Sequence, residues 1–284
     1  MVVPGLLLLV ILGLFSSGLQ NYLCAWVHRR PPLVFVAPVL LALVFSLAAW
    51  RSGAFSSALA ALVLGYVLAP ALCSYCLGYR GDAPAILLLW LPLEFAAGAS
   101  LVPRPAQGYL HAVAYGIAIV LALWLFLIFR GLKGMKYNLP RTSRDGRNVL
   151  VGFALAGPVL IGLGLWLGFL DPLHAPRFAW PKLATRYLTI LAATALPEEI
   201  LFRSLIQNWL MQRFGATHRT LLAAALIFGA SHLDNGPQAL PNWRYFILAS
   251  IAGFAFGKVF QKSSSVLASA SLHALVNTVK YAFF

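Results

Sequence analysis

Residues 197–203 read PEEILFR and lie inside an apolar run that begins near Tyr187. Each charged side chain of this stretch would cost about 2.5 to 3.5 kcal/mol at the centre of a membrane helix. The chain has three glutamates, Glu94, Glu198 and Glu199, and all of them fall within apolar segments. An ionisable side chain in such a segment indicates a functional site by default. The stretch therefore predicts a membrane helix with a functional polar centre.

The composition is typical of a helical membrane protein. The 284 residues are 61% hydrophobic and 10% charged, with a mean hydropathy of +0.84, whereas soluble domains carry about 25% charged residues. Long unbroken apolar runs argue against a transmembrane barrel, whose strands are short and alternate in polarity. We therefore predict an all-α fold, a polytopic transmembrane bundle of about eight to ten membrane helices.

Charged residues and Pro/Gly turns divide the apolar sequence into ten candidate membrane segments. A spanning helix needs roughly 20 residues. The eighth segment is short and could be tilted or buried, and the first three could merge or re-enter the membrane. The segments are 4–26, 33–50, 54–78, 84–103, 109–129, 148–170, 187–212, 219–233, 243–260 and 264–283.

The longest polar connection, 130–147, holds six basic residues and a single acidic residue, Asp145. Such a basic run is typical of a solvated loop at the lipid surface, and the positive-inside rule assigns it to the cytoplasm. It divides the chain into two parts. Residues 1–147 are predicted to be transmembrane helices of unknown role, and residues 148–284 carry the unusual polar motifs.

The net charge of +14 does not indicate nucleic-acid binding, because the basic residues are scattered over short loops between apolar segments. In a membrane protein such loops report topology and contact anionic lipid. We therefore expect membrane lipid as a partner and no nucleic acid. The odd set of cysteines, Cys24, Cys73 and Cys76, predicts no disulfide framework. No basic region precedes the first apolar run, so we expect a retained helix rather than a signal peptide.

The stretch 197–203 contains two kinds of carboxylate. Glu199 and Arg203 are four residues apart, so on a helix they share a face and can neutralise each other. Glu198 is rotated by about 100° from Glu199 and has no cation in the same register. An unpaired carboxylate in a low-dielectric setting is suited to act as a general base. The sequence thus predicts a structural ion pair beside a reactive glutamate.

Two further polar motifs follow toward the C-terminus. The segment FGASH ends at His232, and the segment HALVN begins at His273 and ends at Asn277. His273 and Asn277 are four residues apart and point the same way on a helix. Between the two motifs, Gly253 and Gly257 form a small-xxx-small face that permits close helix packing.

Each motif also has a plain structural interpretation. A single histidine such as His232 in an apolar run is more often a hydrogen-bonded packing residue. His273 and Asn277 could form hydrogen bonds between helices, and Glu94 is expected to be a paired or packing residue. The combination of an unpaired glutamate, two histidines and an asparagine on three helices favours a functional site.

In order, the chain carries Glu-Glu-x-x-x-Arg, Phe-x-x-x-His, Gly-x-x-x-Gly and His-x-x-x-Asn. This pattern resembles the CPBP (ABI) family of glutamic intramembrane proteases, which includes the CAAX prenyl endopeptidases and bacteriocin-processing or immunity relatives. The resemblance covers roughly residues 187–280, while residues 1–147 do not resemble the CAAX enzymes. It implies that residues 148–284 form a CPBP-like intramembrane protease core.

The resemblance implies four catalytic residues. Glu198 would activate the attacking water together with His232. His273 and Asn277 would stabilise the oxyanion of the tetrahedral intermediate. The chemistry of these side chains agrees, because peptide hydrolysis needs a base for water and donors where negative charge develops.

Three further residues, Glu199, Arg203 and Phe228, would support the site structurally. The sequence has no His-Glu-x-x-His zinc motif and no Gly-x-Ser-x-Gly elbow, which other protease classes use. One glutamate and two histidines could bind a metal but can also act without one, so we predict no metal and no other cofactor.

The sequence therefore favours a hydrolase, a glutamic-type intramembrane endopeptidase that cuts a membrane-anchored protein or peptide near its C-terminal tail. The substrate could be a prenylated CAAX tail, a sorting-signal tail or a bacteriocin-like peptide. We expect a multi-pass protein of the bacterial inner (plasma) membrane, and the oligomeric state stays open. The competing interpretation is a non-enzymatic membrane protein, either a transporter or proton relay or an immunity or scaffold factor that retains the motif. A proton path needs no oxyanion pair beside its acid, which favours the enzyme.

Overall fold

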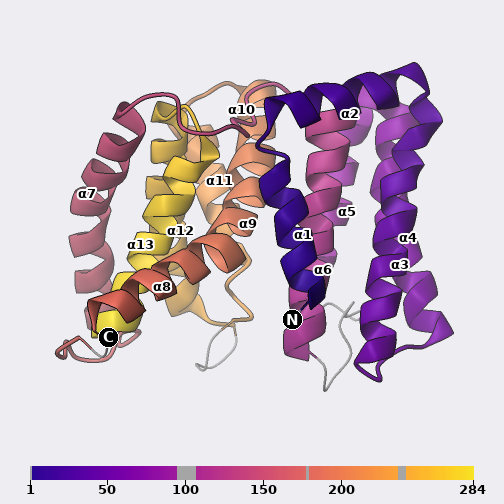
Figure 1. The fold of residues 1–284 in the computed structure, drawn as a ribbon. Coiled ribbons are helices and arrows are strands. Elements are labelled where there is room, and N and C mark those ends of the chain that lie inside the picture. The colour runs from indigo at the N-terminus through magenta and orange to yellow at the C-terminus, as the bar shows by residue number, and fades with distance from the viewer. Residues whose placement is uncertain (1, 95–106, 177–178, 236–240) are drawn as a thin grey trace. The chain divides into compact units, whose positions relative to one another are not determined.

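The structure, a computed structural model, describes residues 2–94, 107–176, 179–235 and 241–284. Every regular element within these ranges is a helix (Figure 1), which confirms the predicted all-α fold. The helices form two compact units, Met1–Gly134 and Met135–Phe284. The predicted division of roles at residue 147 stays a prediction.

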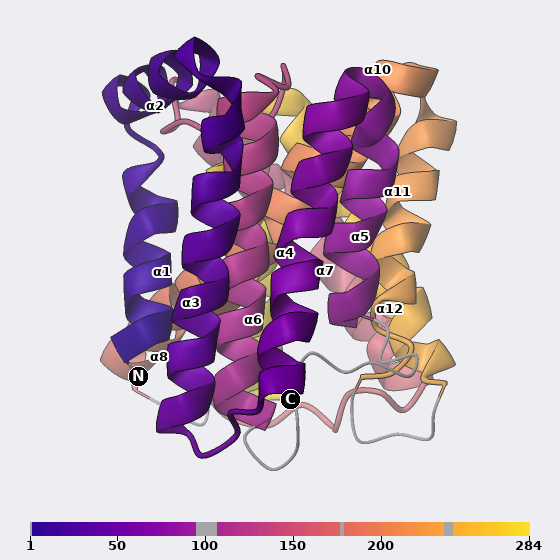
Figure 2. The ribbon, with the colours of Figure 1, turned by 90° about the vertical axis from the view of Figure 1, so that its right-hand side faces the viewer.

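The first unit contains α1 to α6, of which α3 to α6 run nearly parallel or antiparallel to one another (Figure 2). Short 3₁₀ or π-helical turns extend several of these helices. The bounds are α1 Val2–Gly13, α2 Ser17–Arg29, η1 Pro31–Phe35, α3 Val36–Arg51, α4 Ser57–Leu77, η2 Gly78–Gly81, α5 Asp82–Glu94, α6 Gln107–Ala122 and η3 Leu123–Phe129.

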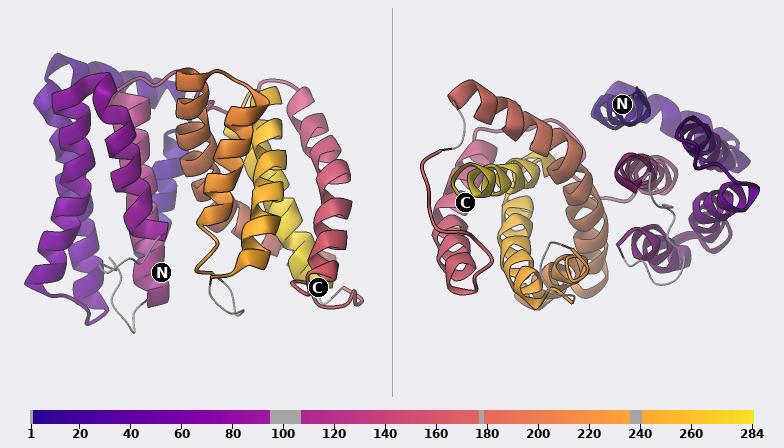
Figure 3. Two further views of the ribbon diagram at one scale, coloured as in Figure 1. Left: turned by 180° about the vertical axis from the view of Figure 1, so that it is seen from behind. Right: turned by 90° about the horizontal axis from the view of Figure 1, so that it is seen from below.

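The second unit contains α7 to α13. Viewed along the helices, α13 lies between α7 and the long helical run from α8 to α10 (Figure 3). The bounds are α7 Arg144–Trp166, α8 Trp180–Ile190, η4 Leu191–Ala195, α9 Leu196–Glu199, η5 Ile200–Gln207, α10 Asn208–Phe214, α11 His218–Ala230, α12 Trp243–Lys262 and α13 Val266–Phe283.

Length and composition make four helical segments of the described chain candidates for crossing a membrane: Pro31–Arg51, Ser57–Glu94, Gly108–Phe129 and Arg144–Trp166. The second of these is 38 residues long and folds back on itself, so that α5 lies beside α4. The Tyr66 hydroxyl of α4 donates a hydrogen bond to the Leu89 carbonyl of α5 at 2.9 Å. Within the described ranges, the helices α8 to α13 fail this test, and the apolar α11 has only 13 residues. The count of eight to ten membrane helices therefore includes segments that are predicted from the sequence alone.

The first predicted segment, 4–26, is not one straight helix. It is broken into α1 and α2, which are bent by 92°. The Ser16 hydroxyl accepts a hydrogen bond from the backbone N–H of Leu19 and so caps the start of α2. The side-chain amide of Gln20 donates to the Leu14 carbonyl at 2.6 Å. These polar side chains satisfy backbone groups that a break exposes, so the Ser/Gln cluster explains the bend.

Two carboxylates of the first unit, the buried Asp82 and the partly exposed Glu94, have partners within that unit. Arg130 Nε lies 3.0 Å from Asp82 Oδ1, and the Tyr115 hydroxyl donates to Glu94 Oε1 at 3.2 Å. Glu94 is thus a paired residue, which confirms the expectation drawn from the sequence.

The predicted surface loop 130–147 is partly buried in the second unit rather than fully solvated. Lys136 adopts a left-handed backbone conformation, with φ 52°, and its ammonium donates to three backbone carbonyls at the end of α12. They belong to Phe260, Gln261 and Ser263, at 2.7, 3.0 and 2.8 Å. Burial lowers the pKa of the Lys136 ammonium, while Asp145 acts in the opposite direction. The loop is drawn inward because the carbonyls of a helix end need donors.

Close packing of α11 and α12 depends on glycines, as the small-xxx-small pattern predicts. A Cβ on Gly253 would meet the Phe228 ring at 2.9 Å, and a Cβ on Gly257 would meet the Gln207 side chain. On α11, a Cβ on Gly229 would meet Ser250. The glycines let the two helices approach closely, and this brings the end of α11 to the polar centre of the unit.

Candidate active site

The Glu199–Arg203 ion pair forms as the four-residue spacing predicts. Arg203 Nε lies 3.0 Å from Glu199 Oε2, and both side chains are fully buried. The two residues sit where the short α9 passes into the π-helical η5, and π-helical turns inside helices are frequent at functional sites. A buried ion pair of this kind is costly to break, so it holds the Glu-Glu-x-x-x-Arg motif in a defined conformation.

The Arg203 guanidinium also packs on aromatic rings. Its central carbon lies 4.6 Å from the centre of the Phe228 ring and 6.0 Å from that of Phe256. Its two terminal nitrogens have no hydrogen-bond partner among the described residues. Phe228 therefore covers the arginine, and its supporting role in the site stays a prediction.

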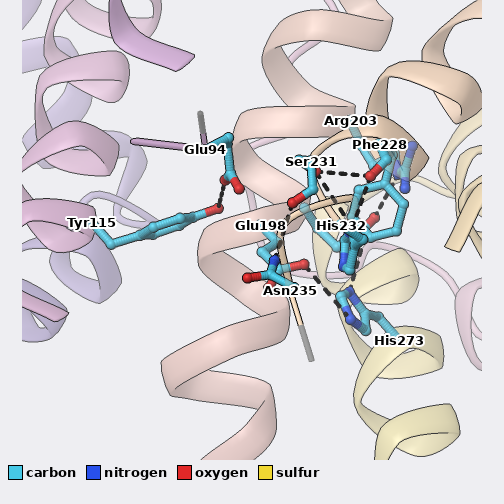
Figure 4. Close-up of polar contacts among 10 residues, drawn as sticks. Glu94, Tyr115, Glu198, Arg203, Phe228, Ser231, His232, Asn235 and His273 are labelled. Carbon is cyan, nitrogen blue, oxygen red and sulfur yellow. Dashed lines mark hydrogen bonds and ion pairs between the residues drawn. The ribbon is translucent and has the colours of Figure 1, made fainter. Parts of the chain in front are cut away.

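Glu198 differs from its neighbour. Its Oε2 is buried and lacks a hydrogen-bond partner within the described part of the chain. An unpaired buried carboxylate oxygen is expensive, so it needs a water or a ligand to satisfy it. The Nε2 atom of His273 lies 3.9 Å from Glu198 Oε2 (Figure 4).

His273 lies between the two carboxylates. Its Nδ1 is 3.2 Å from Glu199 Oε1, and its Nε2 faces Glu198. The ring stacks on Phe256, with centres 4.7 Å apart and planes inclined by 18°. A carboxylate can only accept, so the bond to Glu199 places a proton on Nδ1 and leaves Nε2 for the reaction space. The sequence did not indicate this bridge, because the glutamates and His273 lie on different helices.

His232 reaches the same region because α11 is short. The helix ends at Ala230, two residues before His232, and the His232 side chain therefore lies close to the level of His273 along the helices. Its Nδ1 is 2.9 Å from the Phe228 carbonyl, and its ring packs against the Phe228 ring at 4.8 Å. Phe228 contacts the His273 ring as well, at 5.9 Å. The shared contact with Phe228 thus places His232 and His273 in one region of the second unit.

The protonation pattern of His232 follows from its contacts. A carbonyl oxygen can only accept, so Nδ1 carries a proton, and in the neutral ring Nε2 is an acceptor. Tyr245 packs edge-on against this ring at 4.5 Å, which fixes its orientation. His232 is thus arranged to take a proton from a water or to orient one.

A cavity of about 90 Å³ lies beside these residues within the second unit. Its polar lining includes His232, His273 and Asn277, together with Tyr245 and Lys280. Its other walls are apolar side chains of α7, α11, α12 and α13 and of the segment after α7. One buried water needs roughly 10 to 15 Å³ of such space, so the cavity has room for several waters, and a peptide would extend beyond it. Glu198 is not part of the lining and reaches the cavity region only through His273.

Asn277 is the fourth member of the predicted catalytic set. It is half-buried on α13, one turn after His273, and lines the cavity. The structure therefore brings Glu198, His232, His273 and Asn277 to one region of one unit. Within the described residues, there is no group of three or more His, Cys, Asp or Glu side chains that could hold a metal ion.

The chain matches the family model described as Type II CAAX prenyl endopeptidase Rce1-like over residues 180–279. This segment is CAAX protease-like. The match begins at α8 and ends within α13, so it includes all the residues of the polar cluster, and it confirms the resemblance drawn from the motifs. No curated protein and no solved structure matches the chain.

The matching family is a family of proteases, and the apolar helices make the chain an integral membrane protein. Three residues near the polar cluster were not singled out from the sequence: Phe256 and Tyr245 within the CAAX protease-like segment, and Lys280 directly after it. Aromatic residues are common on membrane helices, so the first two carry no distinguishing signal. Lys280 does have one, since it follows His273 by seven residues and so shares its helix face.

Proposed function

We propose that the protein is an intramembrane endopeptidase that hydrolyses a peptide bond near the C-terminal, membrane-associated tail of a protein or peptide. The observation that carries this proposal is the buried, unpartnered Glu198 Oε2, 3.9 Å from His273, beside a cavity lined by His232 and Asn277. Peptide hydrolysis needs a base, a water and oxyanion donors in one place, and this region offers the base and the donors.

In the proposed reaction, Glu198 and His232 activate a water. The water oxygen forms a bond to the scissile carbonyl carbon while Glu198 takes its proton. The resulting tetrahedral intermediate collapses, the bond between carbon and nitrogen breaks, and the proton passes to the leaving amine. His232 is suited to assist, because its Nδ1 is held by the Phe228 carbonyl and its Nε2 is open to accept.

His273 and Asn277 are proposed to stabilise the oxyanion. The Asn277 amide is a donor, and His273 donates from Nε2 when its ring is protonated on both nitrogens. Negative charge that develops on the carbonyl oxygen would then meet fixed donors in a water-poor site.

Glu199, Arg203 and Phe228 are proposed to act as supports. Glu199 orients His273 through the bond to Nδ1, Arg203 neutralises Glu199, and Phe228 covers the guanidinium and holds both histidine rings. Removing a support would disturb the geometry of the donors rather than remove a reacting group.

The family match and the apolar helices support a proposal for the substrate class. We propose a membrane-anchored substrate, with a prenylated CAAX tail, a sorting-signal tail and a bacteriocin-like peptide as the candidates, and the bacterial inner membrane as the location. No metal is required in this mechanism, in which Glu198 takes the place of a metal-bound base.

The proposed activity can be tested in host cells. Membrane proteins of cells that carry the wild-type chain are expected to show new, shortened C-termini by mass spectrometry, and cells that carry Glu198→Gln are expected to lack them. Glu94→Gln is a matched control, because it neutralises a glutamate that belongs to the first unit. Identical C-termini with the wild type and Glu198→Gln would refute the protease and favour the non-enzymatic alternative.

A further inference from the structure

A groove of about 300 Å³ runs along one face of α7 and α12, within the second unit. Its floor is apolar and buried, at Ala156 and Val259. On α7 it is bordered by Val151, Leu155 and Val159, which are 50%, 71% and 52% exposed. None of the described residues lines both this groove and the cavity beside the proposed catalytic residues. The groove is therefore a separate site with exposed apolar side chains along its edge.

One end of the groove is basic. Lys258 and Lys262 of α12 line it, one helical turn apart. The Asn148 amide of α7 donates to the Lys262 carbonyl at 3.0 Å, so the start of α7 and the end of α12 lie together at this end. Within the described ranges, no carboxylate is at ion-pair distance from either lysine. Asp145, the acidic residue at the start of α7, instead accepts from the backbone N–H of Ser264 at 2.7 Å.

The length of the groove matches one leaflet of a bilayer. Its lining extends from Asn148 to Val159 on α7 and from Lys262 to Ile251 on α12. Eleven residues correspond to about 16.5 Å along a helix axis. The hydrocarbon core of a bilayer is about 30 Å thick, so one leaflet contributes about 15 Å. The groove therefore reaches from its basic end to about the depth of the bilayer centre.

We propose that this groove binds one anionic phospholipid, with an acyl chain along α7 and α12 and the phosphate at Lys258 and Lys262. Basic pockets between membrane helices bind anionic lipid head groups, and an apolar floor favours an acyl chain over water. The proposal assigns a single lipid class to a defined site, which a general contact with membrane lipid does not. It is independent of the proposed protease activity.

The first test measures lipid binding by native mass spectrometry of purified, delipidated protein in a neutral detergent. The probes are dioleoylphosphatidylglycerol and dioleoylphosphatidylcholine. The wild type is expected to bind one phosphatidylglycerol about 30-fold more tightly than phosphatidylcholine, the combined effect of two lysines near a membrane surface. Phosphatidylglycerol should also raise the melting temperature, because it binds the folded state. Equal binding of the two lipids by the wild type would overturn the proposal.

Lys258→Gln with Lys262→Gln is expected to lose the preference for phosphatidylglycerol, and Lys258→Arg with Lys262→Arg to retain it. The matched control is Arg213→Gln with Arg219→Gln, which removes two exposed charges of the same unit that do not line the groove. This control should retain the preference. An unchanged preference in the lysine-to-glutamine variant, or an equal loss in the control, would show that no specific site exists at these lysines.

The second test concerns the apolar part of the groove. Ala255→Trp fills the groove and is expected to weaken phosphatidylglycerol binding at least 10-fold, whereas Ala154→Trp, on α7 but outside the lining, should leave it unchanged. Free glycerol 3-phosphate has no acyl chain and should bind far more weakly than the lipid. Equal affinity for glycerol 3-phosphate and phosphatidylglycerol would overturn the proposal. A lipid-free dimer that Ala255→Trp dissociates would assign the groove to a second copy of the chain and would overturn it too.

Discussion

The two units differ in one carboxylate, Glu198 of the second unit. In the first unit, Asp82 pairs with Arg130 and Glu94 accepts from the Tyr115 hydroxyl. In the second, Glu199 is engaged from two sides, while its neighbour Glu198 keeps a buried oxygen for which the described residues offer no partner.

We use this difference to distinguish carboxylates that stabilise the fold from carboxylates that we propose to act in catalysis. A buried carboxylate with a partner stabilises the arrangement that contains it, and its loss is felt as instability. A buried carboxylate oxygen without a partner costs free energy in the resting protein. Such a cost is tolerated where the group must meet a water or a substrate, and the predictions below follow from that distinction.

The largest effect is expected for Glu198. Glu198→Gln in purified protein should lower the rate of substrate cleavage by about 10²- to 10⁴-fold, because the variant loses the proton acceptor. Its thermal stability in detergent should stay close to that of the wild type, and His232→Ala should behave in the same way. Near-wild-type turnover by Glu198→Gln would remove the distinction between the two glutamates.

Arg203 should show the opposite pattern. Arg203→Ala leaves Glu199 buried without its cation, at a cost of about 3 to 5 kcal/mol in unfolding free energy. Expression level and melting temperature should fall further than in Glu198→Ala, and Arg203→Ala with Glu199→Gln should recover part of the loss. Equal stability of Arg203→Ala and Glu198→Ala would argue that the ion pair is not structural.

Lys136 tests whether a charged group with hydrogen-bond partners stabilises the fold outside the membrane segments as well. Lys136→Met removes the donor from three helix-end carbonyls and keeps the aliphatic stem. Loss of hydrogen bonds from a charged group should cost about 1.5 to 3 kcal/mol, measured as denaturant-induced unfolding. Lys262→Met serves as the control because Lys262 is exposed. Equal stability of the two variants would show that the loop is not anchored through Lys136.

In the first unit, the expected effect is smaller. The Arg130 and Asp82 side chains are 23% and 9% exposed, so solvent screens the pair, and Arg130→Ala should cost only about 1 kcal/mol. The cleavage rate should not change. A loss of activity with unchanged melting temperature would contradict the assignment of this pair to structure alone.

No effect is expected from metal removal. The proposed mechanism uses Glu198 and His232 as proton acceptors, so treatment with a strong chelator followed by gel filtration should leave the cleavage rate unchanged. Metal content can be measured on the same sample by mass spectrometry. Inactivation by the chelator that added zinc reverses would show that a metal, rather than an unpaired carboxylate, generates the nucleophile.

Several features of this protein could be predicted from the sequence alone. High hydropathy and few charges determined the helical membrane class, because only a helix or a closed barrel satisfies backbone groups in lipid. The four-residue spacing of Glu199 and Arg203 determined their ion pair, since both lie on one helix and the contact is local. The motif residues Glu198, His232, His273 and Asn277 could be identified as candidates because charged and polar groups are rare in apolar runs.

The tertiary structure alone decided how these residues meet. His273 bridges Glu198 and Glu199, and Phe228 contacts Arg203 and both histidine rings, through contacts between residues that are far apart in sequence. The break between α1 and α2 and the partial burial of Lys136 likewise depend on which backbone groups a neighbouring segment leaves unsatisfied. Periodicity reports the face on which a side chain lies, but not what packs against that face. The position of Lys280 in the cavity wall could therefore be recognised only once α7, α12 and α13 had been brought together.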